Sequence, residues 1–96
     1  MAKFKRSFTS GGKAVSTANQ VINFTGKRGQ GISNVDYEVE FLSFETFGTA
    51  CNIKLNDEDT IHWIDADSKI VFSDIVIDSI TIIDAGVEYY YTAFAE

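Results

Sequence analysis

The stretch from Lys69 to Phe94 most constrains the fold, and it reads KIVFSDIVIDSITIIDAGVEYYYTAF. β-Branched and aromatic residues in such density suit a pleated, half-buried surface. Two apolar runs flank Asp84-Ala85-Gly86, and Gly86 can adopt the positive φ that a tight turn requires. The stretch therefore predicts a C-terminal β-hairpin with a further strand before it.

Upstream segments also alternate between apolar and polar residues. The segment from Val35 to Phe44 alternates cleanly until the apolar parity changes at Leu42, which indicates a bulge, a bend or burial of both faces. A second parity change falls at Asp78-Ser79, where we expect a bulge or strand break at which the chain crosses between sheets. Further strands are expected at residues 20–24, 49–55, 60–64 and 69–72, with polar turns at 56–59 and 65–68.

About seven short strands separated by polar turns predict an all-β chain. The expected fold is an antiparallel β-sandwich of the jelly-roll or immunoglobulin-like kind. Residues 1–19 are poor in large apolar side chains, so we expect an extended basic N-terminal arm there and a β-sandwich domain over residues 20–96. A short helix over residues 13–22 is the alternative, although Ser, Thr, Asn and two β-branched residues disfavour it.

The net charge of −6 is unevenly distributed. Six of the eight basic residues lie in the first 28 positions, whereas all fourteen acidic residues lie from Asp36 onward. A basic arm on an acidic body is expected, and the body should repel nucleic acid and anionic membranes. The start lacks the apolar region of a secretory signal, and no apolar run approaches the ~20 residues that span a bilayer.

Residues with catalytic or ligand chemistry are few. Cys51 shares parity with Ile53 and Leu55, which favours a buried, inert thiol. His62 has the opposite parity to Trp63, which favours a solvent-facing or edge histidine.

Acidic residues flank the strand expected at 60–64, but their spacing is not that of a calcium-binding EF-hand loop, and solvated turn carboxylates are the favoured interpretation. The Gly-Lys pairs at 12–13 and 26–27 lack the spacing of a phosphate-binding loop. We therefore expect no catalytic centre, no metal and no cofactor.

Aromatic side chains are the remaining candidates for function. Adjacent tyrosines on a strand point to opposite faces, so Tyr89 and Tyr91 should line one face and Tyr90 the other. Exposed aromatics stack on sugar rings or anchor protein interfaces, while core residues with wet hydroxyls are the simpler alternative. The candidate interface residues are Lys3, Phe4, Lys5, Arg6, Phe8, Trp63, Tyr89, Tyr90 and Tyr91.

From Asn52 onward the chain carries "I-x-W-I-D-A", then "I-x-I-D-S-I-x-I", then "D-A-G-V" before a closing aromatic strand. This pattern, over about half of the chain, resembles small β-sandwich structural proteins of tailed bacteriophages, the auxiliary proteins of heads and tails. The resemblance implies a non-enzymatic virion protein, capsid-decorating or otherwise auxiliary, that is made in the host cytoplasm and lacks a signal peptide.

Its expected partner is the major capsid protein or another virion protein, in a homo-oligomer such as a trimer, with the arm lying across neighbouring subunits. A second hypothesis is a carbohydrate-binding module with Trp63 and Tyr90 as stacking platforms. A third is a small hydrolase built around Cys51 or His62.

Overall fold

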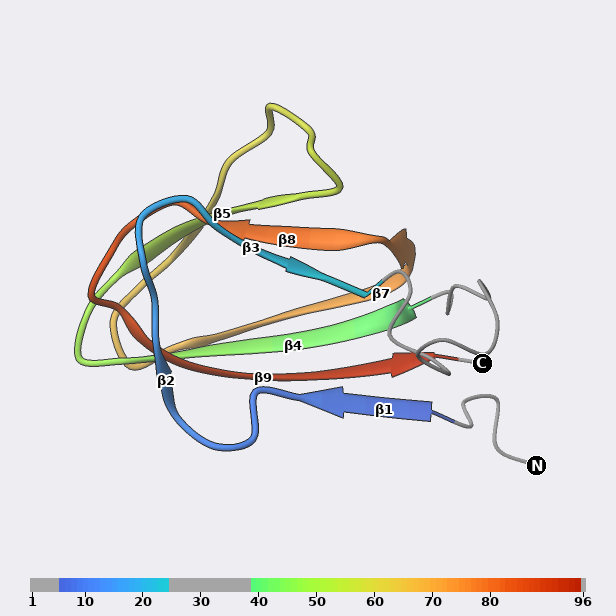
Figure 1. Cartoon of the computed structure of the whole chain (residues 1–96), viewed down its shortest axis with the longest axis horizontal. Coiled ribbons are helices and arrows are strands. Elements are labelled where there is room, and N and C mark those ends of the chain that lie inside the picture. The colour runs from blue at the N-terminus through green and yellow to red at the C-terminus, as the bar shows by residue number, and fades with distance from the viewer. Residues whose placement is uncertain (1–5, 25–38, 96) are drawn as a thin grey trace, which may run out of the picture.

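The computed structural model describes residues 6–24 and 39–95, and these residues form strands and turns without a helix. The loop expected at 26–31 and the beginning of the strand expected from residue 35 lie outside them. Sheet A has the strand order β1-β9-β4-β7, with β2 also paired to β9, and sheet B has the order β3-β8-β5-β6. Every pair is antiparallel. Figure 1 shows how the strands are arranged in two layers.

The strands of sheet A are β1 (Arg6–Thr9), β2 (Ala14–Val15), β4 (Val39–Phe47), β7 (Lys69–Ile77) and β9 (Glu88–Ala95). The strands of sheet B are β3 (Gln20–Asn23), β5 (Cys51–Leu55), β6 (His62–Ile64) and β8 (Ser79–Ile82). The expectation of an all-β chain with antiparallel sheets is confirmed, with nine strands in the described residues rather than about seven.

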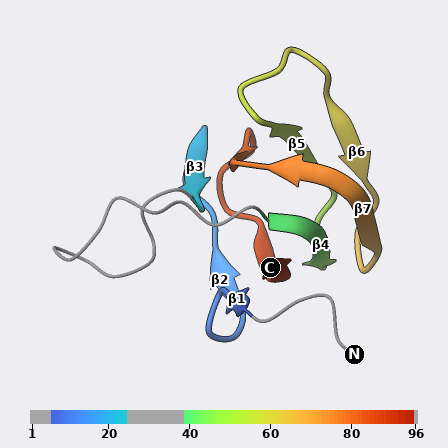
Figure 2. The ribbon, with the colours of Figure 1, turned by 90° about the vertical axis from the view of Figure 1, so that its right-hand side faces the viewer.

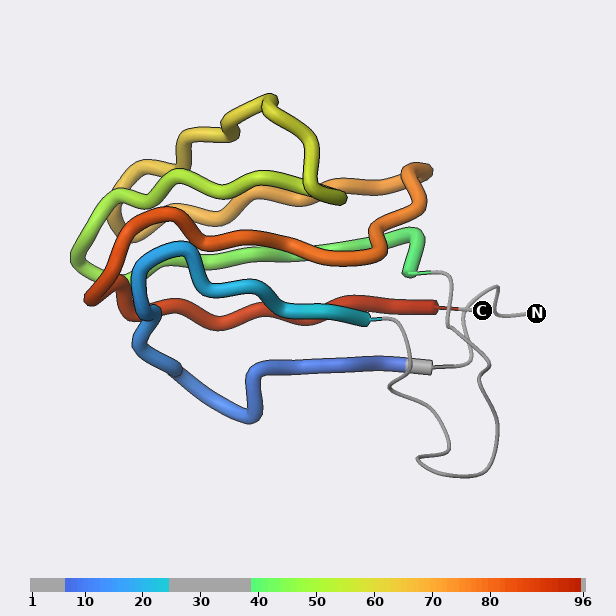
Figure 3. Tube along the Cα trace, turned by 45° about the horizontal axis from the view of Figure 1, so that its top comes forward, coloured from blue at the N-terminus to red at the C-terminus, as the bar shows by residue number. Residues whose placement is uncertain are grey.

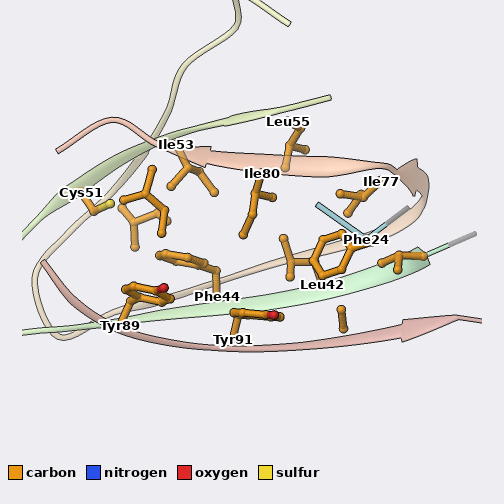
Figure 4. Packing of buried hydrophobic residues seen from close by; sticks show 14 of the residues in the cluster. Phe24, Leu42, Phe44, Cys51, Ile53, Leu55, Ile77, Ile80, Tyr89 and Tyr91 are labelled. Atoms are coloured by element: carbon orange, nitrogen blue, oxygen red, sulfur yellow. The ribbon is translucent and has the colours of Figure 1, made fainter. Parts of the chain in front are cut away.

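The two sheets lie face to face with the apolar core between them, an arrangement compatible with the expected β-sandwich. In Figure 4, Ile53 and Ile80 of sheet B point toward Phe44, Tyr89 and Tyr91 of sheet A. The Phe44 and Tyr89 rings are stacked, with centroids 5.4 Å apart. Burying one large apolar side chain stabilises the folded state by about 2 kcal/mol. Summed over this core, apolar burial is the main contribution that stabilises a domain of this size.

Both parity changes in the sequence correspond to irregularities of the strands. Val39 pairs with Ala95 and Phe41 with Phe94, so Glu40 is an extra residue in β4 and forms a bulge. The extra residue changes the parity of burial from odd to even positions along β4, as the sequence predicted. At Asp78 the chain leaves sheet A at the end of β7 and enters sheet B at β8, so the predicted crossing between sheets is confirmed.

Asn56 fixes this crossing. Its side-chain amide nitrogen donates to the Val76 carbonyl at 2.7 Å, and its amide oxygen accepts from the Asp78 N–H at 2.6 Å. Asn56 itself has a φ of 54°, a conformation that asparagine tolerates better than most residues.

The predicted C-terminal hairpin is wrong. The strands on either side of Asp84-Ala85-Gly86, β8 and β9, belong to different sheets and do not pair with each other. The reason is that their apolar faces turn toward each other across the core, as Ile80 and Tyr91 do in Figure 4, whereas the two strands of a hairpin share one face. Gly86 does have the expected positive φ, at 77°.

The N-terminal segment contains two strands that its composition did not predict. Residues 6–9 and 14–15, assigned from composition to the arm, pair with β9 as β1 and β2, and no helix forms over residues 13–22. Backbone pairing requires no particular side chain, so the scarcity of apolar residues did not reveal it. The Phe8 ring adds an apolar contact, with its centroid 6.0 Å from that of Phe24.

A polar network holds the second crossing, between β8 and β9, to the N-terminal segment. Ser16, 4% exposed, donates from its hydroxyl to the Asp84 carbonyl at 2.6 Å and accepts from the Val87 N–H at 3.0 Å. The Asp84 carboxylate accepts from the backbone N–H and the side-chain amide of Asn52 at 2.8 and 3.1 Å. Segments from both ends of the chain and from β5 therefore meet at this crossing.

We predict that Phe24→Ala lowers the free energy of unfolding by about 3–5 kcal/mol, since the ring is fully buried between Phe8 and Tyr91. Urea unfolding followed by tyrosine and tryptophan fluorescence measures the loss. Val21→Ala is the matched control, because Val21 is 53% exposed and its truncation should cost less than about 0.5 kcal/mol. Equal effects of the two substitutions would contradict the packing described.

Candidate interaction surfaces

The outer face of sheet A carries outward-pointing side chains from three adjacent strands, β9, β4 and β7. The register places Tyr90 beside Glu45, Thr92 beside Ser43 and Phe94 beside Phe41, and it continues from β4 to Lys69, Val71 and Ser73 of β7. Cross-strand neighbours lie about 5 Å apart, so these nine residues form a continuous surface, here called the sheet A face.

The chemistry of the sheet A face differs from that of the rest of this acidic protein. Its charges, Glu45 and Lys69, are cross-strand partners in one row at one end. The middle row holds two hydroxyls, Thr92 and Ser43, and Val71, which is 49% exposed. At the far end the Phe41 and Phe94 rings are 5.3 Å apart.

A second surface lies along the side of the domain where β6 and β7 are the outer strands. The His62 ring of β6 meets the Phe72 ring of β7 edge-on at 5.0 Å, so the outer strands of the two sheets lie together, as Figure 2 shows. Seven large apolar side chains are exposed in the described residues. Besides Val71 of the sheet A face, four of them lie on or next to β6 and β7: Ile61, Trp63, Ile75 and Val76.

Trp63 is the most exposed aromatic side chain of this surface. It is 59% exposed, and its indole N–H donates to the Asp65 carboxylate at 2.7 Å, which fixes the edge of the ring and leaves its faces available. Trp63 points outward from sheet B because its neighbours His62 and Ile64 point inward. Tyr90 points outward from sheet A, so the two rings lie on opposite faces of the domain and cannot flank a single binding site.

The other predicted interface residues are placed differently. Lys3, Phe4 and Lys5 lie outside the described residues, while Arg6 pairs through its backbone with Ala95. Phe8 is packed against the core, which removes its ring from the candidate interface.

Tyr89 and Tyr91 are 3% and 5% exposed and face the core, so a partner has almost no surface of either to contact. The Tyr89 hydroxyl accepts from the Gln20 side-chain amide at 3.1 Å. Burial, and secondarily the neighbouring Tyr89, raises the pKa of the Tyr91 phenol. The predicted alternation of the three tyrosines is confirmed, and Tyr90 is the one on the outer surface.

Cys51 and His62 do not form a nucleophile and base. Cys51 is fully buried, and burial followed by the Asp84 charge raises its pKa to about 11, which keeps it a thiol rather than a reactive thiolate. Its sulfur lies 3.7 Å from the Asn52 carbonyl. His62 pairs with Ile53 and packs against Phe72, half-buried at the edge of the domain.

The acidic turn residues do not gather into a metal site. In the part of the chain that the structure describes, no group of three or more His, Cys, Asp or Glu side chains is arranged to hold a metal ion. The described residues, 6–24 and 39–95, also enclose no pocket. They also include no helix long and apolar enough to cross a membrane.

Comparison with protein-family models, with curated proteins and with solved structures finds no match for this chain.

The sequence predicts the sheet A face only in part. The alternation of Tyr90, Thr92 and Phe94 is visible in the sequence, as is that of Phe41 and Ser43. What the sequence does not show is that these two sets are neighbours, because the register of β4 on β9 depends on the Glu40 bulge.

We predict that native Cys51 reacts with iodoacetamide at pH 8 at least about 100-fold more slowly than the same chain in denaturant. A pKa raised from 9.0 to about 11 reduces the thiolate fraction by about that factor, and burial adds to the effect. Mass spectrometry of timed samples measures the rate, with glutathione as a control for the effect of denaturant on the reagent. Equal rates in the native and unfolded chain would contradict the burial of the thiol.

Proposed function

We propose that this chain is a non-enzymatic adhesion protein, an auxiliary structural component of a tailed-phage virion. In this proposal the sheet A face docks on a protein lattice such as that of the major capsid protein. The observation that carries it is an aromatic and hydroxyl surface, whose two charged residues, Glu45 and Lys69, are cross-strand neighbours at one end, on a protein of net charge −6. Cores of protein–protein interfaces are depleted in charge and enriched in aromatic residues.

The geometry also supports a rigid docking surface. β4 and β9 are central strands, each paired on both sides, so the middle of the sheet A face is held by backbone hydrogen bonds as well as by the core beneath it. Thr92 and Ser43 present hydroxyls that both donate and accept hydrogen bonds. A preordered surface of this kind loses little conformational entropy on binding.

The size of the surface indicates how it would act. Three strands about 4.8 Å apart and three outward positions about 6.8 Å apart cover roughly 300 Å². A stable interface buries about 800 Å² per partner, so one copy would bind weakly. Several copies in a homo-oligomer would gain affinity by avidity on a repeating lattice. The resemblance of residues 52–94 to phage auxiliary proteins supports the same partner.

We predict that Ser43→Arg weakens binding to purified capsids of the phage that encodes this chain by about 100-fold. An unpaired cation at the centre of a desolvated interface costs roughly 3 kcal/mol. Cosedimentation over a range of protein concentrations measures the affinity. Thr81→Arg is the control, because Thr81 pairs with Lys54 and lies on sheet B, away from the sheet A face. Undiminished binding by a folded Ser43→Arg chain would rule out this face as the docking surface.

A carbohydrate-binding module is the second candidate, and the exposure of Trp63 is the observation that favours it. Because Tyr90 lies on the other sheet, the sugar would stack on Trp63 alone, beside the Asp65 carboxylate that fixes the ring. Flanking carboxylates can accept hydrogen bonds from sugar hydroxyls.

We predict for this alternative that saturable binding on a glycan array is lost in Trp63→Ala and retained in Tyr90→Ala, since only Trp63 supplies the stacking surface. Circular dichroism and thermal unfolding of both variants check that the fold persists. The absence of any saturable glycan binding by the unaltered chain, or its survival in Trp63→Ala, would eliminate the module.

A further inference from the structure

The side of the domain formed by β6, β7 and their turns combines exposed apolar side chains with a concentration of negative charge. Between residues 57 and 78 the chain carries seven acidic residues and one basic residue, Lys69. All seven are exposed: Asp57, Glu58, Asp59, Asp65, Asp67, Asp74 and Asp78. We call this surface, with the four apolar residues Ile61, Trp63, Ile75 and Val76, the acidic edge.

The negative charge of the acidic edge is not neutralised within the described chain. None of its seven carboxylates forms an ion pair with a residue of the ranges 7–24 and 39–95, where the side chains are described. The Asp67 carboxylate accepts a hydrogen bond from the Gly48 N–H at 2.8 Å. A partner for this surface should therefore carry positive charge together with an apolar group.

The backbone of β7 offers a way to bind such a partner. In the described part of the chain β7 pairs only with β4, along one of its two sides. Residues Lys69–Ser73 of β7 pair with β4 in regular register. The other side of β7 is an open sheet edge, to which an extended segment can add as a further strand.

The chain itself contains a segment of matching chemistry. Residues 1–5 read MAKFK, so one lysine precedes Phe4 and one follows it. In an extended chain Lys3 and Lys5 share one side and Phe4 takes the other. The acidic edge of a second copy would repel the same acidic edge, so a symmetric contact of edge with edge is disfavoured.

The segment cannot lie along β7 of its own copy. It precedes β1, and the row of partners Arg6, Ala95, Val39 and Ile77 places β1 three strand spacings from β7. The open side of β7 is one spacing further, about 19 Å away. Five residues reach at most about 17 Å, so they would be fully extended before they could run along the strand.

We propose that residues 1–5 of one copy dock on the acidic edge of a second copy, as a strand added to β7. Figure 3 shows that β1 begins at the same end of the domain as the corner between β7 and β8. The contact is head-to-tail, and repetition of such a contact generates a closed ring or an open chain of copies. This contact uses the open backbone edge of β7, whereas the sheet A face consists of outward side chains of β9, β4 and β7.

The test is the mass of the full chain in solution by sedimentation velocity, at increasing concentration in 50 mM and 500 mM NaCl. The proposal predicts association that is concentration-dependent at low salt and at least about 10-fold weaker at high salt, because screening weakens exposed ion pairs. Lys5→Glu should raise the dissociation constant at least about 10-fold, whereas Lys54→Glu, an equal charge change on sheet B, should change it less than about 2-fold.

Charge reversal on the other side of the contact completes the test. Asp59→Lys/Asp78→Lys is suitable because neither side chain forms a hydrogen bond within the described residues and neither residue has positive φ. This variant and Lys3→Glu/Lys5→Glu should each be monomeric alone at 50 mM NaCl and should associate when mixed.

Three results would overturn the proposal. A chain that stays monomeric to about 1 mM at low salt has no such contact. Association that Lys5→Glu and Lys54→Glu weaken equally would arise elsewhere on the surface. Failure of the two reversed variants to associate on mixing, while both remain folded by circular dichroism, would exclude the pairing of residues 1–5 with the acidic edge.

Discussion

The structure depends on one constraint: β8 and β9 turn their apolar faces toward each other and so belong to opposite layers. The chain crosses from sheet A to sheet B at Asp78 and returns between residues 83 and 87. Each crossing is held by side chains that satisfy backbone groups, Asn56 at the first and Ser16 with Asp84 at the second. At the second crossing, loss of the Ser16 bonds would leave the Val87 N–H without its buried partner, which would cost about 1–3 kcal/mol.

The same constraint determines which surfaces the molecule presents. Because β9 returns to the middle of sheet A, its outward residues Tyr90, Thr92 and Phe94 lie beside those of β4. Because β6 and β7 end up as outer strands on the same side, the acidic turns on either side of β6 lie with the open edge of β7. Two surfaces of different chemistry, one with few charged residues and one strongly negative, thus follow from one arrangement of strands.

The sequence predicted the features that are local. Alternation over a few residues gave the strands at 20–24, 49–55 and 60–64, the burial of Cys51 and the two parity changes, because side-chain direction in a strand depends only on position along it. It did not predict which strands pair. A turn between two apolar runs suits a hairpin and a crossing equally well, and the difference lies in contacts between residues distant in sequence.

The pairing of the N-terminal segment and the placement of the aromatic side chains could not be predicted from the sequence, for related physical reasons. β1 and β2 are held largely by backbone bonds to β9, which leave no compositional trace. Trp63 and Tyr90 are both outward-facing, as their parity allowed, but the assignment of their strands to opposite sheets separates them. The sequence pattern allows Tyr89 and Tyr91 to be either core or surface residues. They are buried because β9 lies over the apolar face of sheet B.

The most direct measurement of the central claim is the pattern of interstrand nuclear Overhauser effects from Thr81 in the middle of β8. The structure predicts backbone contacts of Thr81 with Val21 on one side and Lys54 on the other, and none with residues 88–90. Contacts between residues 80–82 and 88–90 would instead show a hairpin. That result would place β8 beside β9 and remove the basis for both surfaces.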